Sequence, residues 1–329
     1  MERVFLQHST SKLSLRAGQL IQTEQDGSET AHPICATELV EVYGNAQITT
    51  QAVKECLKEG VRINYFTIHG KYLGRLEPGY PKNTRRRMEQ CHLYYDTQRR
   101  LSWCKALQVA KVRGELVELR RQKEHGLIFP YEEIREELRG RMDEIEEATS
   151  VEELLGIEGQ CAREYYRMFP YILPEGVEWC GRSYHPAQDG VNEILSCVYG
   201  ILAQCFREET EHWSLDPHCG FLHEPRYGGA GLTYDLLEIQ RATVGDHLAF
   251  RLIRGNEELQ EVARKKEAGH LNDKLYRPLA SRVREALGKS YHRQKWTPQE
   301  QMQKIVEMTV KSLEGDGEAP DYKAMQPER

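Results

Sequence analysis

One histidine and two acidic side chains near the middle of the chain have the types and the spacing of a metal site. His223 ends a short apolar run, and Asp235 and Glu238 follow in a segment with helical periodicity. Three residues advance about 300° around a helix, so these two acids share a face about 60° wide. Imidazole and carboxylate ligands together suit Mg²⁺ or Mn²⁺, and the imidazole favours Mn²⁺. Such an ion polarises a phosphoryl oxygen, which indicates phosphodiester chemistry.

A third acid, Glu158, stands out because it interrupts an apolar helix face. It lies between Leu154 and Cys161 in a stripe with helical spacing. A carboxylate on such a face is costly unless it is paired or bound to a metal. We therefore predict that Glu158 joins the histidine and the second acid as a metal ligand. The alternative is a structural salt bridge from Glu158 to an arginine such as Arg163 or Arg182.

The segment 82–125 carries a local excess of basic residues in an acidic chain. The formal net charge of the chain is −6, but this segment has twelve basic and five acidic residues, a balance of +7. Tyr94, Tyr95 and Trp103 lie among them, which is typical of a surface that binds DNA phosphates. The alternative is a solvated helix face. The predicted DNA-binding residues are Arg85, Arg86, Arg87, Arg99, Arg100, Lys111, Arg182 and Arg241.

The elements that must position these residues change in type near residue 80. Short alternating runs over residues 1–80 predict strands with one short helix, and a breaker cluster follows at 78–81. Beyond it the periodicity is helical, with one long helix over 82–125 and another from Tyr234 to Ile253. On an unbroken helix Asp246 would join Asp235 and Glu238 in one acidic arc. We expect an α+β protein with a small β-rich N-terminal domain (1–80), a larger all-α catalytic and DNA-binding domain (81–313) and a flexible tail (314–329).

Composition excludes several other classes of protein. Nine scattered cysteines contain no CxxC pair, which argues against a structural zinc or iron–sulfur site. No apolar run reaches the length of a membrane helix, and the N-terminus lacks the apolar region of a signal peptide. We therefore expect a cytoplasmic protein.

Several short motifs, in this order and spacing, resemble the CRISPR-associated integrase-endonuclease family, Cas1. They are residues 155–159 (LGIEG), 181–186 (GRSYHP), 189–192 (DGVN), 215–217 (LDP) with 220–223 (GFLH), and 235–238 (DLLE) with Arg241 and Asp246. The resemblance implies that Glu158, His223 and Glu238 are the metal ligands, and that Asp235 is a neighbouring acid that supports the site.

The resemblance also implies an activity and partners. Members of this family insert short DNA fragments into a CRISPR array by transesterification, in which a 3′-hydroxyl attacks a repeat-end phosphodiester. They act on double-stranded and branched DNA as homodimers joined mainly through the β-rich domain, usually around a Cas2 dimer. Two alternatives stay open, namely a non-catalytic DNA-binding scaffold of the same fold and an unrelated metal-dependent phosphodiesterase.

Overall fold

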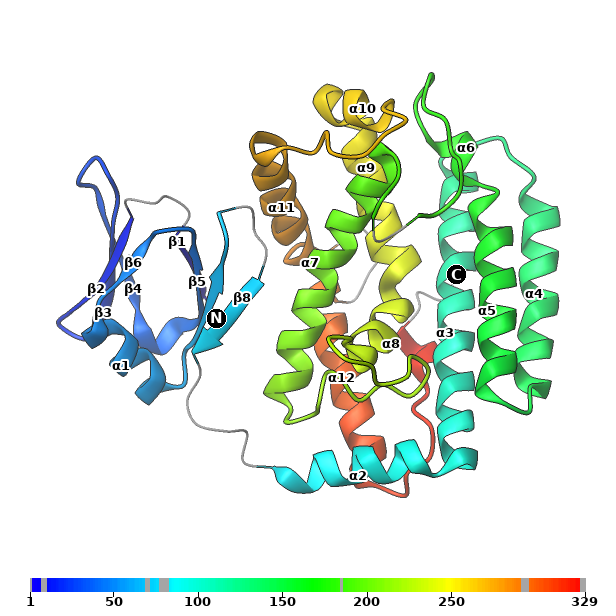
Figure 1. The fold of residues 1–329 in the computed structure, drawn as a ribbon, viewed down its shortest axis with the longest axis horizontal. Helices are drawn as coiled ribbons and strands as arrows, with labels where there is room; N and C mark the ends of the chain where they lie inside the picture. Colours follow the sequence, from blue (N-terminus) through cyan, green and yellow to red (C-terminus); the bar gives the residue numbers. More distant parts are fainter. Residues whose placement is uncertain are drawn as a thin grey trace. The chain divides into compact units, whose positions relative to one another are not determined.

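The chain divides into two compact units, Met1–Tyr80 and Pro81–Arg329, which are described separately. A computed structural model describes residues 2–6, 11–68, 72–76, 83–183, 186–290 and 296–325. The first unit is β-rich and the second is helical, which confirms the predicted α+β class (Figure 1). The breaker cluster at 78–81 lies outside the described residues. Within the described residues, no helix combines the length and the apolar character needed to cross a membrane.

The N-terminal unit consists of two four-stranded sheets and one helix. One sheet has the order β1-β5-β7-β8, in which β1, β5 and β7 are parallel and β8 is antiparallel to β7. The other has the order β4-β3-β2-β6. The strands are β1 (Glu2–Leu6), β2 (Lys12–Arg16), β3 (Gln19–Thr23), β4 (Glu29–Pro33), β5 (Thr37–Tyr43), β6 (Gln47–Ile48), β7 (Arg62–Phe66) and β8 (Tyr72–Leu76). A short 3₁₀ helix, Ile34–Ala36, precedes β5.

One apolar core holds these two sheets together. Alternating residues of both sheets, such as Leu13 and Val40, are fully buried in the same cluster as Cys56 of α1 (Thr50–Glu59). The Thr49 hydroxyl caps α1 by accepting a hydrogen bond from the Ala52 N–H, as expected for a threonine at a helix start. Alternation with period two therefore places one face of each sheet on the core.

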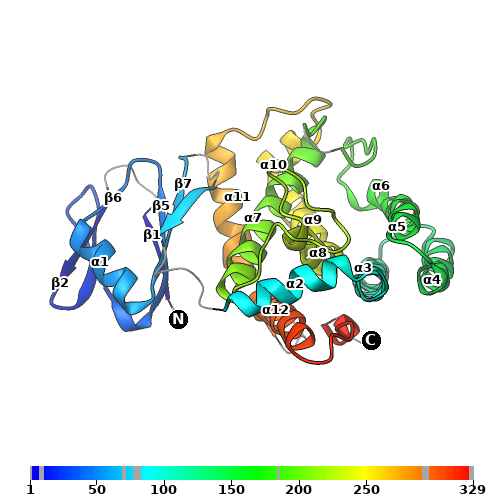
Figure 2. The same cartoon turned by 60° about the horizontal axis from the view of Figure 1, so that its bottom comes forward.

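The second unit is a bundle of helices around a single large core. In Figures 1 and 2, α3, α4 and α5 lie side by side, and α3 also contacts α8. The helices are α2 (Thr84–Tyr95), α3 (Thr97–Glu124), α4 (Tyr131–Glu147), α5 (Val151–Tyr166), α6 (Phe169–Ile172), α7 (Gly190–His212), α8 (Gly231–Gln240), α9 (His247–Arg254), α10 (Glu257–Ala263), α11 (Asp273–Leu287) and α12 (Pro298–Glu314).

The helix predicted over 82–125 is two helices instead of one. The backbone leaves the helical region at Asp96, whose φ and ψ are −84° and 97°. The Asp96 carboxylate accepts a hydrogen bond from the Arg99 N–H at 3.1 Å and caps α3. An aspartate that can bond the next turn favours a helix start over a helix interior, and this overrides the continuous basic pattern.

The predicted continuous helix from Tyr234 to Ile253 is also interrupted. Residues Arg241–Asp246 form a π-helical segment between α8 and α9. The wider turn changes the direction of every following side chain, so the acidic arc predicted at about 100° per residue is wrong. Asp246 accepts a hydrogen bond from the Tyr199 hydroxyl of α7, whereas Asp235 bonds to residues 221–223.

The segment after α12 differs from the predicted flexible tail. The Trp103 indole N–H donates a 3.0 Å hydrogen bond to the Gly317 carbonyl, and Tyr322 is fully buried in the core of the helical unit. Tyr322 begins a 3₁₀ turn, Tyr322–Met325, and its hydroxyl lies 2.8 Å from that of Thr309. The segment is therefore anchored to the helical core through Gly317 and Tyr322; residues 326–329 lie outside the described part of the chain.

Candidate active site

A stripe of polar residues runs along one face of α3 and forms the floor of the candidate site. Its members lie within about 60° of each other around the helix axis. Three of them are buried glutamate or glutamine side chains, and residues of these types are mostly found on the surface. The stripe consists of Arg100, Lys111, Glu115, Glu118 and Gln122.

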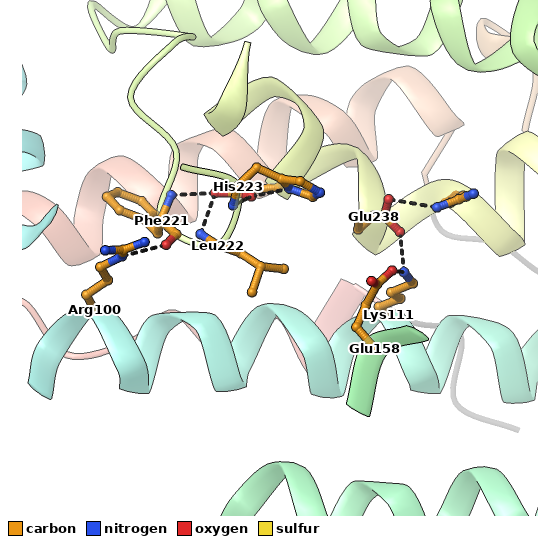
Figure 3. A network of polar contacts seen from close by, with 9 residues as sticks. Arg100, Lys111, Glu158, Phe221, Leu222, His223 and Glu238 are labelled. Carbon is orange, nitrogen blue, oxygen red and sulfur yellow. Dashed lines mark hydrogen bonds and ion pairs between the residues drawn. The ribbon is translucent and has the colours of Figure 1, made fainter. Parts of the chain in front are cut away.

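Lys111 lies at the centre of the site, between two of the predicted metal ligands. Its Nζ donates a hydrogen bond to Glu158 Oε1 of α5 and lies 2.8 Å from Glu238 Oε2 of α8. Figure 3 shows both carboxylates directed at this ammonium group. The Lys111 side chain is 3% exposed, while Glu158 is 25% exposed at the edge of the apolar face of α5. The partner of Glu158 is therefore a lysine and not one of the two arginines considered from the sequence.

The charges at this centre stabilise one another. Burial alone would lower the pKa of Lys111, but the neighbouring Glu238 and Glu158 raise it well above its ordinary value. Burial alone would raise the pKa of Glu238, but Arg241 and Lys111 lower it to about 2. Both groups are therefore charged at neutral pH.

Arg241 fixes the other side of the Glu238 carboxylate. The guanidinium lies 2.9 Å from Glu238 Oε1 and donates a 2.7 Å hydrogen bond to the Tyr166 hydroxyl. The guanidinium also lies over the Tyr199 ring, with 4.9 Å between Cζ and the ring centroid. Arg241, the first residue of the π-helical segment, therefore holds Glu238 of α8 in place.

Asp235 organises the loop that carries His223. Its fully buried carboxylate accepts hydrogen bonds from the N–H groups of Phe221 at 2.6 Å, Leu222 at 3.1 Å and His223 at 2.9 Å. It also lies 2.7 Å from Nδ1 of the His223 ring. Burial alone would lower the pKa of His223, but this hydrogen bond raises it. Asp235 thus fixes both the backbone and the ring of the histidine, as a supporting acid would.

Two glycines let this loop close against the start of α8. A Cβ atom added at Gly220 or at Gly231 would lie 2.5 Å from the His223 carbonyl oxygen. At Gly220 it would also lie 2.5 Å from the Gly231 carbonyl carbon. Arg100 of α3 supports the loop from below, since its Nε–H donates a 2.7 Å hydrogen bond to the Phe221 carbonyl (Figure 3). Gly231 therefore serves close packing at the beginning of α8.

Most of the predicted DNA-binding residues have structural partners within the helical unit. Lys111, Arg100 and Arg241 belong to the site described above. Arg86 pairs with Glu314 at 2.6 Å and donates to the Trp213 carbonyl at 3.0 Å. Arg182 donates to Asn192 Oδ1 at 2.9 Å and to the Ser196 hydroxyl at 3.0 Å.

The remaining basic residues lie nearer the surface. Arg85 is 87% exposed and only 4.0 Å from its neighbour on α2, Glu89, while Arg87 and Arg99 are half-buried. DNA contact by Arg85, Arg87 and Arg99 stays a prediction. The motif residues Tyr184 and His185 lie outside the described residues.

The donor set suits a hard divalent cation, but its members surround a lysine. Glu158 and Glu238 offer oxygen atoms to one cationic centre. Because Nδ1 of His223 faces Asp235, its Nε2 is left without a hydrogen bond among the described residues, as a metal-binding imidazole requires. Within the same residues, no three His, Cys, Asp or Glu side chains lie close enough together to hold a metal ion. The ligand roles of Glu158, His223 and Glu238 stay predictions.

Sequence reasoning missed the roles of Lys111 and Glu115. Both were part of a segment that was assigned to a surface because of its net charge. The signal that could have found them is spacing, since polar residues at 111, 115, 118 and 122 follow the intervals of 4, 3 and 4 that normally mark the buried face of a helix.

Comparison with known proteins identifies the family. A family model described as CRISPR associated protein Cas1 matches residues 4–285. A CRISPR-associated endonuclease Cas1 of Thermus thermophilus is 33% identical over 244 residues, which cover 74% of this chain and 69% of that protein. The chain therefore belongs to the Cas1 family, and the resemblance seen in its motifs is confirmed.

Solved structures agree on the fold. A chain of a Cas6-RT-Cas1–Cas2 complex has a TM-score of 0.77 and 17% identity, and the match covers all of this chain and 36% of that one. A casposase bound to its integration product has a TM-score of 0.72 and 20% identity, with 100% and 95% of the two chains covered. At these identities the likeness concerns the fold.

Proposed function

We propose that this protein is a metal-dependent DNA integrase and endonuclease that inserts new spacer DNA into a CRISPR array. The observation that supports the proposal most is the convergence of Glu158 and Glu238, from two separate helices, on one cationic centre. Membership of a family whose relatives are named endonucleases adds to it. The fold shared with a casposase bound to an integration product fits the same activity.

The proposed reaction is a transesterification on DNA. The 3′-oxygen of the incoming fragment forms a bond to the phosphorus at the repeat end, and the bond from that phosphorus to the 3′-oxygen of the neighbouring nucleotide breaks. The attacking hydroxyl loses a proton and the departing oxygen gains one. The number of phosphodiester bonds is unchanged, so the step needs no nucleotide as an energy source. Hydrolysis differs only in that water replaces the 3′-hydroxyl.

Some residues of the chain would bind the metal ion, and others orient the residues that bind it. Glu158, Glu238 and Nε2 of His223 would hold a Mg²⁺ or Mn²⁺ ion, which when bound polarises the phosphoryl oxygen and stabilises the charge of the transition state. Asp235 keeps Nδ1 of His223 occupied, so that Nε2 is the nitrogen available to a ligand. Arg241 holds Glu238 in its ionised form.

Substitution of the two ligands that come from different elements tests the proposal. Glu158→Gln and His223→Ala are expected to reduce strand transfer on branched DNA by at least about 100-fold, because loss of a ligand removes transition-state stabilisation. The matched control is Glu152→Gln, an exposed acid on the same helix, which should act as the wild type. Joined product is measured on a gel, and circular dichroism checks the fold.

Full activity in either ligand variant, or activity unaffected by EDTA, would contradict the proposal. The two alternatives give distinct results. A non-catalytic scaffold would bind branched DNA but show no Mn²⁺-induced rise in melting temperature and no joined product. An unrelated phosphodiesterase would hydrolyse linear DNA and release fragments without joining them.

We propose as partners double-stranded and branched DNA, a second copy of the chain bound through the β-rich unit, and a Cas2 dimer. The shared fold with a chain of a Cas6-RT-Cas1–Cas2 complex supports the last of these. Light scattering after size-exclusion chromatography, with and without Cas2, measures the masses. A monomer at micromolar concentration would contradict the dimer.

A further inference from the structure

We propose that Lys111 is a built-in counter-cation that competes with the divalent metal for Glu158 and Glu238, and that Glu115 receives the displaced ammonium group. The site would therefore exchange one lysine for one metal ion. This inference rests on the proposed metal-dependent function and assigns a role to two residues that hold no metal themselves.

The first support is the geometry of Lys111. One Nζ atom contacts a carboxylate oxygen of Glu158 and lies 2.8 Å from one of Glu238, the two acids that come from α5 and α8 (Figure 3). The side chain reaches this place from the interior of α3 and is 3% exposed. An ion bound by the same two oxygen atoms would lie within a few ångströms of Nζ, where two like charges repel strongly in a buried site. The two cations therefore exclude each other.

The second support is an unpartnered acid one turn further along α3. Glu115 lies four residues after Lys111, so both project from the same side of the helix. Its side chain is 3% exposed, and Oε2 is buried without a hydrogen-bond partner among the described residues. Burial raises the pKa of Glu115 to about 8 against the opposing effect of Lys111, so an ammonium group that moved closer would favour the ionised carboxylate. A buried carboxyl group with a free oxygen, one helical turn away, is a place to which a displaced ammonium group can turn.

The exchange explains why two carboxylates can be held close together before any metal binds. Without a cation between them, Glu158 and Glu238 would repel each other, and the helices that carry them would be pushed apart. Lys111 supplies that cation from within the chain. The same contact makes metal binding weaker than the carboxylates alone would allow, because Nζ must first leave.

Metal affinity of the full chain in the absence of DNA tests the competition. Lys111→Met keeps the length of the side chain but removes the charge, so the Mn²⁺ dissociation constant is expected to fall at least tenfold. Free Mn²⁺ is measured by electron paramagnetic resonance during a titration. The control is Lys123→Met on the same helix, since Lys123 pairs with the exposed Glu132, and its affinity should equal that of the wild type. Equal or weaker binding by Lys111→Met would overturn the proposal.

Glu115→Gln tests the destination and does not depend on how well the lysine variant folds. Glutamine cannot ionise, so the displaced ammonium group has no carboxylate to pair with and the dissociation constant should rise at least threefold. In Lys111→Met the added Glu115→Gln change should then have no effect on Mn²⁺ binding, because there is no ammonium group to receive. An unchanged affinity in the single Glu115→Gln variant would overturn the role of Glu115.

These results separate the inference from the function on which it rests. If the wild type binds Mn²⁺ and needs it for strand transfer, but Lys111→Met binds it no more tightly, then the competition is wrong and the proposed function stands. If neither the wild type nor the variant binds Mn²⁺, then both are wrong.

Discussion

At the scale of single residues, the helical unit buries several ionisable groups whose charge depends on their neighbours. Asp246 is one that lies outside the proposed metal ligands. Burial raises its pKa to about 6 from an ordinary value of 3.8, although Arg241 and the Tyr199 hydroxyl oppose this shift. The folded protein therefore holds more protons than the unfolded chain between about pH 4 and pH 6.

The sign of this effect gives a prediction for Asp246→Asn. The contribution of Asp246 to the free energy of unfolding is largest below pH 4 and falls by about 3 kcal/mol as the pH rises through 6. Asparagine carries no charge at any pH. The difference in stability between variant and wild type should therefore shift in favour of the variant by about 2 kcal/mol between pH 4 and pH 7. Urea unfolding at both pH values measures it, and a pH-independent difference would contradict the assigned protonation.

The sequence identified the residues of the site unevenly, for physical reasons. Glu158 interrupts an apolar helix face and His223 ends a short apolar run, so their chemistry is visible locally. Lys111 has no such contrast, because it is one of twelve basic residues in the segment 82–125, and only its spacing from residues 115, 118 and 122 hints at the buried face that the packing of α3 shows. Asp235 looked like an equal of Glu238 by spacing. Its role depends on three backbone N–H groups from residues 221–223, and periodicity carries no information on such long-range contacts.

At the scale of the elements, the site depends on how closely the loop 220–231 approaches the start of α8. Gly231→Ala would place a methyl group 2.5 Å from the His223 carbonyl oxygen and 2.9 Å from the Gly220 nitrogen, and neither backbone atom can move independently. We expect a loss of about 2–3 kcal/mol in stability from overpacking. Strand transfer should fall as well, because His223 moves with its backbone.

The control for this variant is Gly200→Ala, an exposed glycine within α7 with open space around it. Alanine there should stabilise the protein by about 0.5–1 kcal/mol, since glycine is a poor helix former. Thermal unfolding compares the two. The packing argument would be wrong if Gly231→Ala were as stable as the wild type with normal activity.

Element boundaries were predicted less well than element types. The helical pattern over 82–125 does not show the break at Asp96, because the basic residues continue on both sides of it. The π-helical segment Arg241–Asp246 is equally invisible, since a pattern with period 3.6 tolerates one wide turn. The second difference matters more, because the π-helical segment turns Asp246 away from the helix face on which the periodicity had placed it.

At the scale of the whole molecule, the segment after α12 belongs to the helical core. A chain ending at Gly315 would lose the burial of Tyr322 and the hydrogen bond from Trp103 to the Gly317 carbonyl. These losses together amount to about 3–5 kcal/mol. The melting temperature should drop by several degrees, whereas a chain ending at Met325 should melt as the full-length protein does. Calorimetry distinguishes the two, and equal melting temperatures would contradict the packing of this segment.

The fold class was predictable because the change from period two to period 3.6 near residue 80 is strong. The packed end of the chain was not, because residues 314–325 are rich in glycine and acids. Such a composition normally indicates a solvated tail. The segment is anchored by Tyr322 and by the Gly317 carbonyl group, and the overall composition of the segment does not reveal either contact.

The polar stripe on α3 limits where insertions and deletions can occur among related sequences. Arg100 supports the loop 221–223 and Lys111 meets Glu158 and Glu238, while Arg121, beside the stripe, donates a 3.2 Å hydrogen bond to the Thr243 carbonyl. Inserting or deleting one residue between these positions would turn everything beyond it by about 100°. Alignments with relatives should therefore be free of gaps from residue 100 to residue 122. Differences in length should fall in connections such as 125–130, where no site residue depends on the count.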